Sequence, residues 1–273
     1  MNYKKLFFPI GGGEELKERI EGAFLIAKHF NVKLEVLKSS LKADNSINKV
    51  YGISKELYSE LAEIVDTKFN EENEEFVQFF NEILEQSDID NNLIDLSIKE
   101  GVRSSLVEQQ SKFCDLVIAA APPSGLATAT FETAVLKSGK PVLMFPRVMK
   151  SFSTDSIIIG WNNSSEVSRA VTSAIEIIKK AQKVHIVSSE DYSNEQILVD
   201  LIGYLELHGV NPTYEVVKTT RIPGQALLDN ALDGNFGLII AGAYGHRGLR
   251  ELMFGGTTRY LLEHSTIPVF TSH

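Results

Sequence analysis

The chain has 273 residues, 43% hydrophobic and 23% charged, which is typical of a folded globular protein and long enough for two α/β domains. Its formal net charge of −9 argues against nucleic acid or an anionic membrane as the main partner, because both would repel it. The single cysteine excludes an internal disulfide, and no stretch is apolar enough to span a bilayer, so a cytoplasmic protein is expected.

The first half of the chain alternates short apolar runs with helical patterns. Residues 6–10 predict a buried strand, and Gly11, Gly12 and Gly13 turn it into a helix. These glycines do not form a dinucleotide fingerprint, because Leu16 stands where G-x-G-x-x-G needs its third glycine. A helix is expected over residues 101–113. The later strands of this half are expected at residues 32–37, 93–98, 116–121 and 141–145. Cys114, just before the fourth strand, is expected to be a buried and inert thiol.

An acidic and aromatic-rich insert separates the second and third strands. Residues 54–85 predict one long helix or two consecutive helices, and the glutamates at 71–75 are typical of a solvated face. The insert carries more aromatic surface than one helix can bury on its own sheet. We therefore expect its rings to cover the second domain or a second copy of the chain, as in a homodimer. These rings are Phe69, Phe76, Phe79 and Phe80.

The second half repeats the pattern of the first after a polar bridge at residues 148–155. LVIAAA at 116–121 matches LIIAGA at 238–243, and KPVLMF at 140–145 matches IPVFTS at 267–272, so the chain is an internal duplication. The further strands of this half are expected at 157–160, 184–187 and 214–217, with helices at 167–178, 197–208 and 224–232. Alternating strands and helices predict a five-stranded parallel sheet in each half, with helices on both faces and a ligand at the carboxyl ends of the strands.

The glycine-rich segment before the last strand is the main candidate site. Gly242, Gly245, Gly255 and Gly256 follow an apolar run, and Thr257 opens a helical pattern. Glycine lets backbone N–H groups approach phosphate oxygens, and a helix N-terminus attracts the same anion. Glycines that only make turns would fit this segment equally well.

The spacing Gly242-x2-Gly245-x9-Gly255, with the words AYGH, LRELMFGG and PVFTSH, resembles the ATP-binding signature of the universal stress protein family. The resemblance covers nearly the whole chain and implies an α/β protein of two tandem Rossmann-like domains of the adenine nucleotide α-hydrolase type. A degenerate domain with the helical insert would span residues 1–147, and a domain that retains the phosphate loop would span residues 153–273. In family binders Ser or Thr follows the last glycine, whereas here Gly256 takes that place and Thr257 comes one later.

The same resemblance assigns roles to residues of the second half. The glycines would line the phosphates and Thr257 would donate a hydroxyl. Val187 would present backbone groups to the adenine, and Asn162 stands where binders carry Asp. Trp161 either stacks on the base or fills space under the loop. The ligand would be ATP, alone or with Mg²⁺.

The first half lacks the corresponding glycines. Pro122 and Pro123 stand where the second half has its glycine turn, and they remove N–H donors. One nucleotide per chain is therefore expected, in the second half. Family members dimerise through the fifth strand, so a tandem chain is expected to pair 141–145 with 267–272 internally. The resemblance implies a stress-response module. No catalytic residue or metal-ligand set is predicted, so an enzyme beyond weak ATP hydrolysis is not expected. The alternative is a nucleotide-free scaffold or interaction module.

Overall fold

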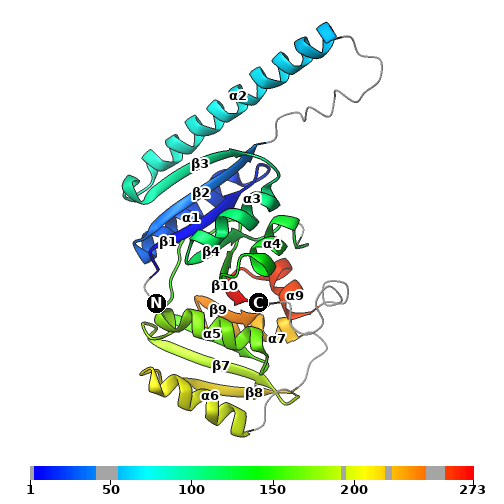
Figure 1. Ribbon diagram of the computed structural model, residues 1–273. Coiled ribbons are helices and arrows are strands. Elements are labelled where there is room, and N and C mark those ends of the chain that lie inside the picture. The colour runs from blue at the N-terminus through cyan, green and yellow to red at the C-terminus, as the bar shows by residue number, and fades with distance from the viewer. Residues whose placement is uncertain (1–2, 41–54, 124, 192–194, 219–222, 244–255) are drawn as a thin grey trace.

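The structure is a computed structural model that describes residues 3–40, 55–123, 125–191, 195–218, 223–243 and 256–273 (Figure 1). Within these residues, ten strands form one sheet in the order β3-β2-β1-β4-β5-β10-β9-β6-β7-β8. The strands of the first half are β1 (Lys5–Ile10), β2 (Lys33–Ser40), β3 (Ile94–Glu100), β4 (Leu116–Ala120) and β5 (Val142–Phe145). Those of the second half are β6 (Ser156–Trp161), β7 (Lys183–Ser189), β8 (Thr213–Val217), β9 (Leu238–Gly242) and β10 (Val269–Ser272).

Helices follow the strands as the alternation predicts. The first half contains α1 (Leu16–Phe30), α2 (Lys55–Gln86), α3 (Arg103–Gln110) and α4 (Ala129–Lys137). The second half contains α5 (Ser165–Ile178), α6 (Glu195–Leu207), α7 (Pro223–Asp233) and α9 (Thr257–His264). The predicted α/β architecture is confirmed, and the helical insert is one helix of 32 residues. None of the helices in the described part of the chain combines the length and the hydrophobicity that crossing a bilayer requires.

The two halves join edge to edge through their last strands. Neighbouring strands run parallel within each half, but β10 pairs with β5 antiparallel, with Phe270 opposite Leu143 and Thr271 opposite Val142. These are the two segments that the sequence placed at the contact between the halves. All four residues of each strand are buried, so this junction lies inside the sheet and not at an exposed edge.

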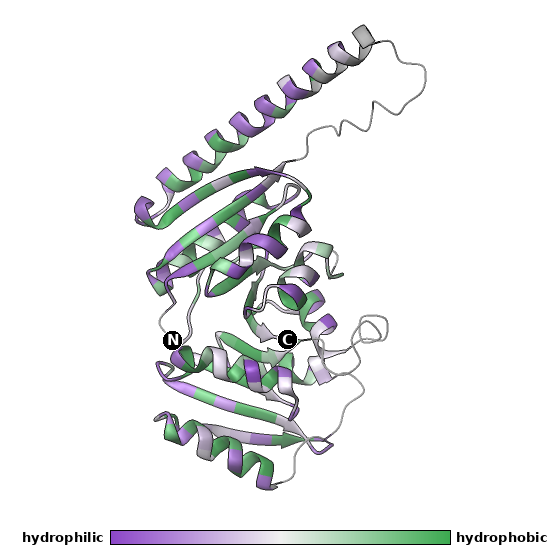
Figure 2. Cartoon of the chain, viewed as in Figure 1, coloured by the Kyte–Doolittle hydropathy of each residue, from purple (hydrophilic) through white to green (hydrophobic). Residues whose placement is uncertain are grey.

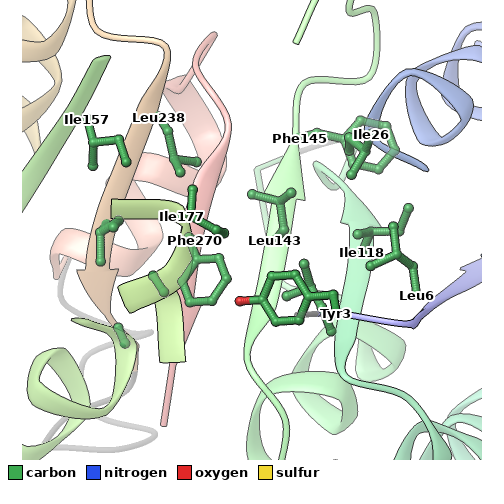
Figure 3. Packing of buried hydrophobic residues seen from close by; sticks show 14 of the residues in the cluster. Tyr3, Leu6, Ile26, Ile118, Leu143, Phe145, Ile157, Ile177, Leu238 and Phe270 are labelled. Carbon is green, nitrogen blue, oxygen red and sulfur yellow. The ribbon is translucent and has the colours of Figure 1, made fainter. Parts of the chain in front are cut away.

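The core forms two layers, one on each face of the sheet. Ile157 and Ile159 of β6 contact the layer with α1 and α5, while Ile158 between them contacts the layer with α3, α4, α7 and α9. The first layer continues across the junction: Tyr3 and Leu143 face Ile177 and Phe270 (Figure 3). Hydrophobic residues are concentrated on the strands, as Figure 2 shows.

The C-terminal part of α2 packs on its own domain. Phe80 is 1% exposed, and its ring lies 5.6 Å from that of Phe24 on α1, edge to face. Phe76 stacks on Phe80 and carries the ammonium group of Lys38 above its ring. The expectation that these rings cover the second domain or a second copy is therefore wrong for Phe80, because its ring is buried against α1 of its own domain. Phe76 is half-buried beside it. The other end of α2 extends beyond the sheet (Figure 1), and Ile64 there is 62% exposed.

Candidate functional site

A cavity of about 200 Å³ lies at the carboxyl ends of the strands of the second half. It is bordered by the ends of β6, β7, β8 and β9 and by the first residues of α7 and α9. In the sheet, β6 lies between β7 and β9, so the chain leaves β6 on one side and returns on the other. Such a switch point is where ligands bind in open α/β sheets.

Six of the eight predicted site residues line this cavity together. They are Trp161, Asn162, Val187, Gly242, Gly256 and Thr257. The other two, Gly245 and Gly255, lie outside the described residues. The resemblance thus assigned to one site residues that are up to 96 positions apart in the sequence (161 to 257) and that line one cavity.

The start of α9 supplies backbone donors to the cavity. Gly256 is its N-cap in an extended conformation, and no side chain caps the helix there. The first N–H groups of a helix have no partner within it and carry partial positive charge. Gly224 of α7 sets the position of this end, because a Cβ at Gly224 would lie 2.8 Å from the Cβ of Tyr260 and 3.0 Å from the carbonyl oxygen of Thr257. The close contact of α7 with α9 holds Thr257 at the cavity.

Asn162 lies in the turn between β6 and α5. Its side-chain oxygen accepts a hydrogen bond of 3.2 Å from the backbone N–H of Ser164, and Ser164 in turn caps α5 by accepting from the N–H of Val167. Asn163, between them, has a φ of 56°, which asparagine tolerates better than most residues. Because the oxygen is used within the turn, the amide nitrogen of Asn162 is the group that a ligand would meet.

The ring of Trp161 packs away from the α7 and α9 side of the sheet. Trp161 follows Ile157 and Ile159 at intervals of two and packs against the same layer, with Val171 and Leu201 beside it. Its carbonyl oxygen accepts a hydrogen bond of 2.7 Å from the hydroxyl of Ser188. Within the described residues its buried indole nitrogen has no hydrogen-bond partner. Of the two roles expected for Trp161, the packing favours filling space over stacking on a base.

Gly242 has a packing role of its own. A Cβ at this position would lie 2.8 Å from the backbone nitrogen of Val167 and 2.9 Å from the Cβ of Glu166, at the start of α5. Glu166 is 6% exposed, and its carboxylate accepts hydrogen bonds from Ser165 and Arg169. Burial raises the pKa of Glu166, but hydrogen bonds from its own backbone and from serines, together with Arg169, hold the pKa below its ordinary value. The carboxylate is therefore ionised near neutral pH.

A family model matches part of the second half of the sequence. The model of the Universal stress protein family matches residues 179–273. This region is a universal stress protein domain. Among curated proteins, no sequence matches the chain.

Solved structures extend the same fold over both halves. A universal stress protein from Archaeoglobus fulgidus is 18% identical, with a TM-score of 0.72 over 98% of this chain and 95% of that one. A functionally unknown protein from Pseudomonas aeruginosa is 15% identical, with a TM-score of 0.54 over 98% of this chain and 92% of that one. At these identities the likeness is one of fold, and it fits a tandem universal stress protein arrangement.

Sequence reasoning missed several residues of the cavity in the second half. They are Ser189, Lys218, Pro223, Ala226 and Leu227, from the ends of β7 and β8 and from α7. Their signal was positional: Lys218 follows directly on a predicted strand, Ser189 lies two residues after another, and Pro223, Ala226 and Leu227 lie at the start of a predicted helix. Among the residues that the structure describes, no group of three or more His, Cys, Asp or Glu is placed to hold a metal ion.

Proposed function

We propose that the second half of the chain binds an adenine nucleotide, ATP in the first instance, at the cavity between β6 and α9. The observation that carries the proposal is the meeting of Asn162, Val187, Gly242, Gly256 and Thr257 around one cavity at a switch point. The family match over residues 179–273 supports the same assignment.

The lining suggests how such a nucleotide would lie. Val187 and Leu227 are each 5% exposed and offer apolar surface for a base, beside the ends of β7 and β8. The N-terminus of α9 offers N–H groups, and Thr257 a hydroxyl, for phosphate oxygens. Mg²⁺ would be held by the phosphates and water, since it binds few protein ligands.

We further propose a binding and regulatory role, in the cytoplasm, instead of rapid catalysis. No carboxylate or imidazole stands among the described residues that line the cavity, so these residues supply no general base to activate a water molecule. A scaffold without nucleotide is the second candidate. The packing role of Gly242 favours it, because close contact with Glu166 and Val167 accounts for this glycine without a ligand.

Calorimetry with ATP on the full chain tests the proposal, using Ala226→Leu as the decisive variant. Ala226 lines the cavity as the fourth residue of α7. Leucine is chosen as the replacement because Leu106 is the fourth residue of α3, the helix at the same place in the first half. The larger side chain should fill the space for the base and weaken ATP binding by about tenfold or more, whereas Gln225→Leu, on the exposed side of α7, should leave it unchanged.

Three outcomes would count against nucleotide binding as described. No heat at about millimolar ATP would favour the scaffold. Two equivalent sites per chain would contradict the expected asymmetry of the halves. Equal affinity of wild type and Ala226→Leu would place the nucleotide elsewhere.

A further inference from the structure

We propose that the first half of the chain holds a second ligand site, which takes a small oxyanion with two or more charges, such as phosphate or pyrophosphate, on three arginines. A cavity of about 400 Å³ lies at the carboxyl ends of β1 and β4. Because β5 and β10 are antiparallel, these ends lie at the opposite edge of the sheet from the cavity of the second half. Arg19, Arg103 and Arg147 all line it.

Arg19 is buried, and within the described residues no ion pair joins it to a carboxylate. It is 7% exposed and comes from the first turns of α1. In the part of the chain that the structure describes, its guanidinium donates to three backbone carbonyls, at 3.2 Å to Glu15, 3.2 Å to Gly12 and 3.4 Å to Gly13. Neutral carbonyl acceptors do not neutralise a buried positive charge, so an anion beside the guanidinium would still be strongly attracted to it.

Arg147 closes the cavity from the segment after β5. Its side chain is 17% exposed and forms an ion pair with Glu15. It also donates to the carbonyls of Glu14, at 2.6 Å, and Ala121, at 3.3 Å. These contacts fix the guanidinium over the loop after β1, beside the carboxyl end of β4.

Arg103 is the first residue of α3 and reaches across the end of β1. Its Nε donates to the hydroxyl of Ser39 at 3.1 Å. The guanidinium lies against Gly11, where a Cβ would be 2.8 Å from its Cζ. Gly11 therefore makes room for the arginine, and the glycine turn of the first half has a function that its spacing did not indicate.

The residues that line the cavity carry more positive than negative charge, because three arginines stand beside one carboxylate, that of Glu14. Burial lowers the pKa of Arg19, and repulsion from Arg147 and Arg103 lowers it further, against the opposing effect of Glu15 and Glu18. Burial lowers the pKa of Arg103 as well. A multivalent anion placed between the guanidiniums would relieve this repulsion, and guanidinium–phosphate hydrogen bonds are among the strongest in proteins.

The N-terminus of α4 adds donors from another side. Thr128 caps this nine-residue helix by accepting from the N–H of Phe131, and Thr130 lines the cavity with it. Helix N-termini attract anions. Pro122 and Pro123 also line the cavity and have no N–H to offer. In the first half the donors for an anion are thus guanidinium side chains, whereas in the second half backbone N–H groups were expected in this role.

The site excludes a nucleotide base. In the register of the sheet, Ile10 pairs with Lys38 as Trp161 pairs with Ser188, so Ser39 corresponds to Ser189. Ser189 lines the cavity of the second half, whereas Ser39 accepts a hydrogen bond from Arg103 and does not line the arginine cavity. Among the described residues, none of β2 or β3 lines the arginine cavity. The proposed ligand is therefore an anion that carries no nucleobase.

Calorimetry with pyrophosphate, and separately with inorganic phosphate, on the full chain tests this site. Arg103→Gln and Arg147→Gln should each weaken pyrophosphate binding by about tenfold or more, and Arg103→Lys should fall between wild type and Arg103→Gln. Lys137→Gln removes a positive charge from the exposed side of α4 and should leave the affinity unchanged. Ala226→Leu should also leave it unchanged, which separates this site from the proposed nucleotide site.

Binding of neither anion at about millimolar concentration would overturn the inference. So would equal pyrophosphate affinity in wild type and in both glutamine variants, because the anion would then bind elsewhere. Melting curves of the variants distinguish lost binding from lost folding. If Arg103→Gln does not fold, the comparison of Arg147→Gln with wild type decides.

Discussion

The hydroxyl of Tyr3 donates a hydrogen bond of 2.9 Å to the backbone carbonyl oxygen of Ser173, and so connects the segment before β1 with α5 of the other half. Tyr3 is 8% exposed, and its ring meets that of Phe30 edge to face at 5.7 Å. The contact lies beside the β5–β10 junction and forms part of the layer that crosses it.

Tyr3→Phe should lower the free energy of unfolding by about 1 kcal/mol near neutral pH, because one hydrogen bond is lost with little change in packing. Burial, and secondly the charge of Asp115, raise the pKa of Tyr3 above its ordinary value. Above pH about 10 the unfolded state then loses this proton while the folded state keeps it, so stability falls as pH rises. Urea unfolding from pH 8 upward should show the advantage of wild type present below about 10 and shrinking above it. An advantage that is independent of pH would contradict the role of this hydroxyl.

Gly242→Ala should destabilise the protein without any ligand. The new Cβ would lie within 3 Å of both Val167 and Glu166, and crowding of this kind costs about 1–3 kcal/mol. Gly203→Ala on α6 is the matched control, since among the described residues nothing beyond the backbone of its own helix lies within 4 Å of the added Cβ, and it should stabilise by about 0.5–1 kcal/mol. Thermal melts of the two variants measure both effects. Equal melting temperatures would mean that β9 and α5 adjust freely, and that Gly242 is present for another reason.

Phe80→Ala should lower the free energy of unfolding by about 3–5 kcal/mol, because the ring is buried where α2 packs against Phe24 of α1. Ile64→Ala, at a position that is 62% exposed on the same helix, should change stability by no more than about 0.5 kcal/mol. Chemical denaturation compares them. Light scattering on the same samples tests the homodimer that the sequence led us to expect: a change of mass in Ile64→Ala alone would place a second copy on the extended end of α2. In the denaturation measurements, similar stability losses in both variants would contradict the packing described for Phe80.

The strands and the glycine-rich site were open to prediction because their signals are local. Buried parallel strands are short apolar runs, and Gly242 to Thr257 is one continuous segment. The helix α4 was not located from the sequence, since only Thr128 marks its start. Trp161 lies an even number of residues after Ile157 on β6, so both side chains point to the same face of the sheet. The sequence does not show which layer covers that face, so the surroundings of Trp161 could not be predicted.

The arginine cavity was beyond such reasoning for a different reason. Its three guanidiniums come from α1, α3 and the segment after β5, and no spacing in the sequence relates them. Pro122 and Pro123 indicated only that backbone donors were lost. The packing of Phe80 was likewise a matter of tertiary contact, because its partner Phe24 lies 56 residues earlier (80 − 24).

The antiparallel junction of β5 and β10 also bears on how the two halves can evolve. In a symmetric dimer every substitution at the interface occurs twice, once on each side of the two-fold axis. Here Leu143 faces Phe270 and Val142 faces Thr271, so a mutation changes one side while the other stays constant. The same freedom applies at the carboxyl ends of the strands, where three arginines line the cavity of the first half and none of the described residues that line the cavity of the second half is an arginine. Joining the copies in one chain releases each from the requirement to match the other.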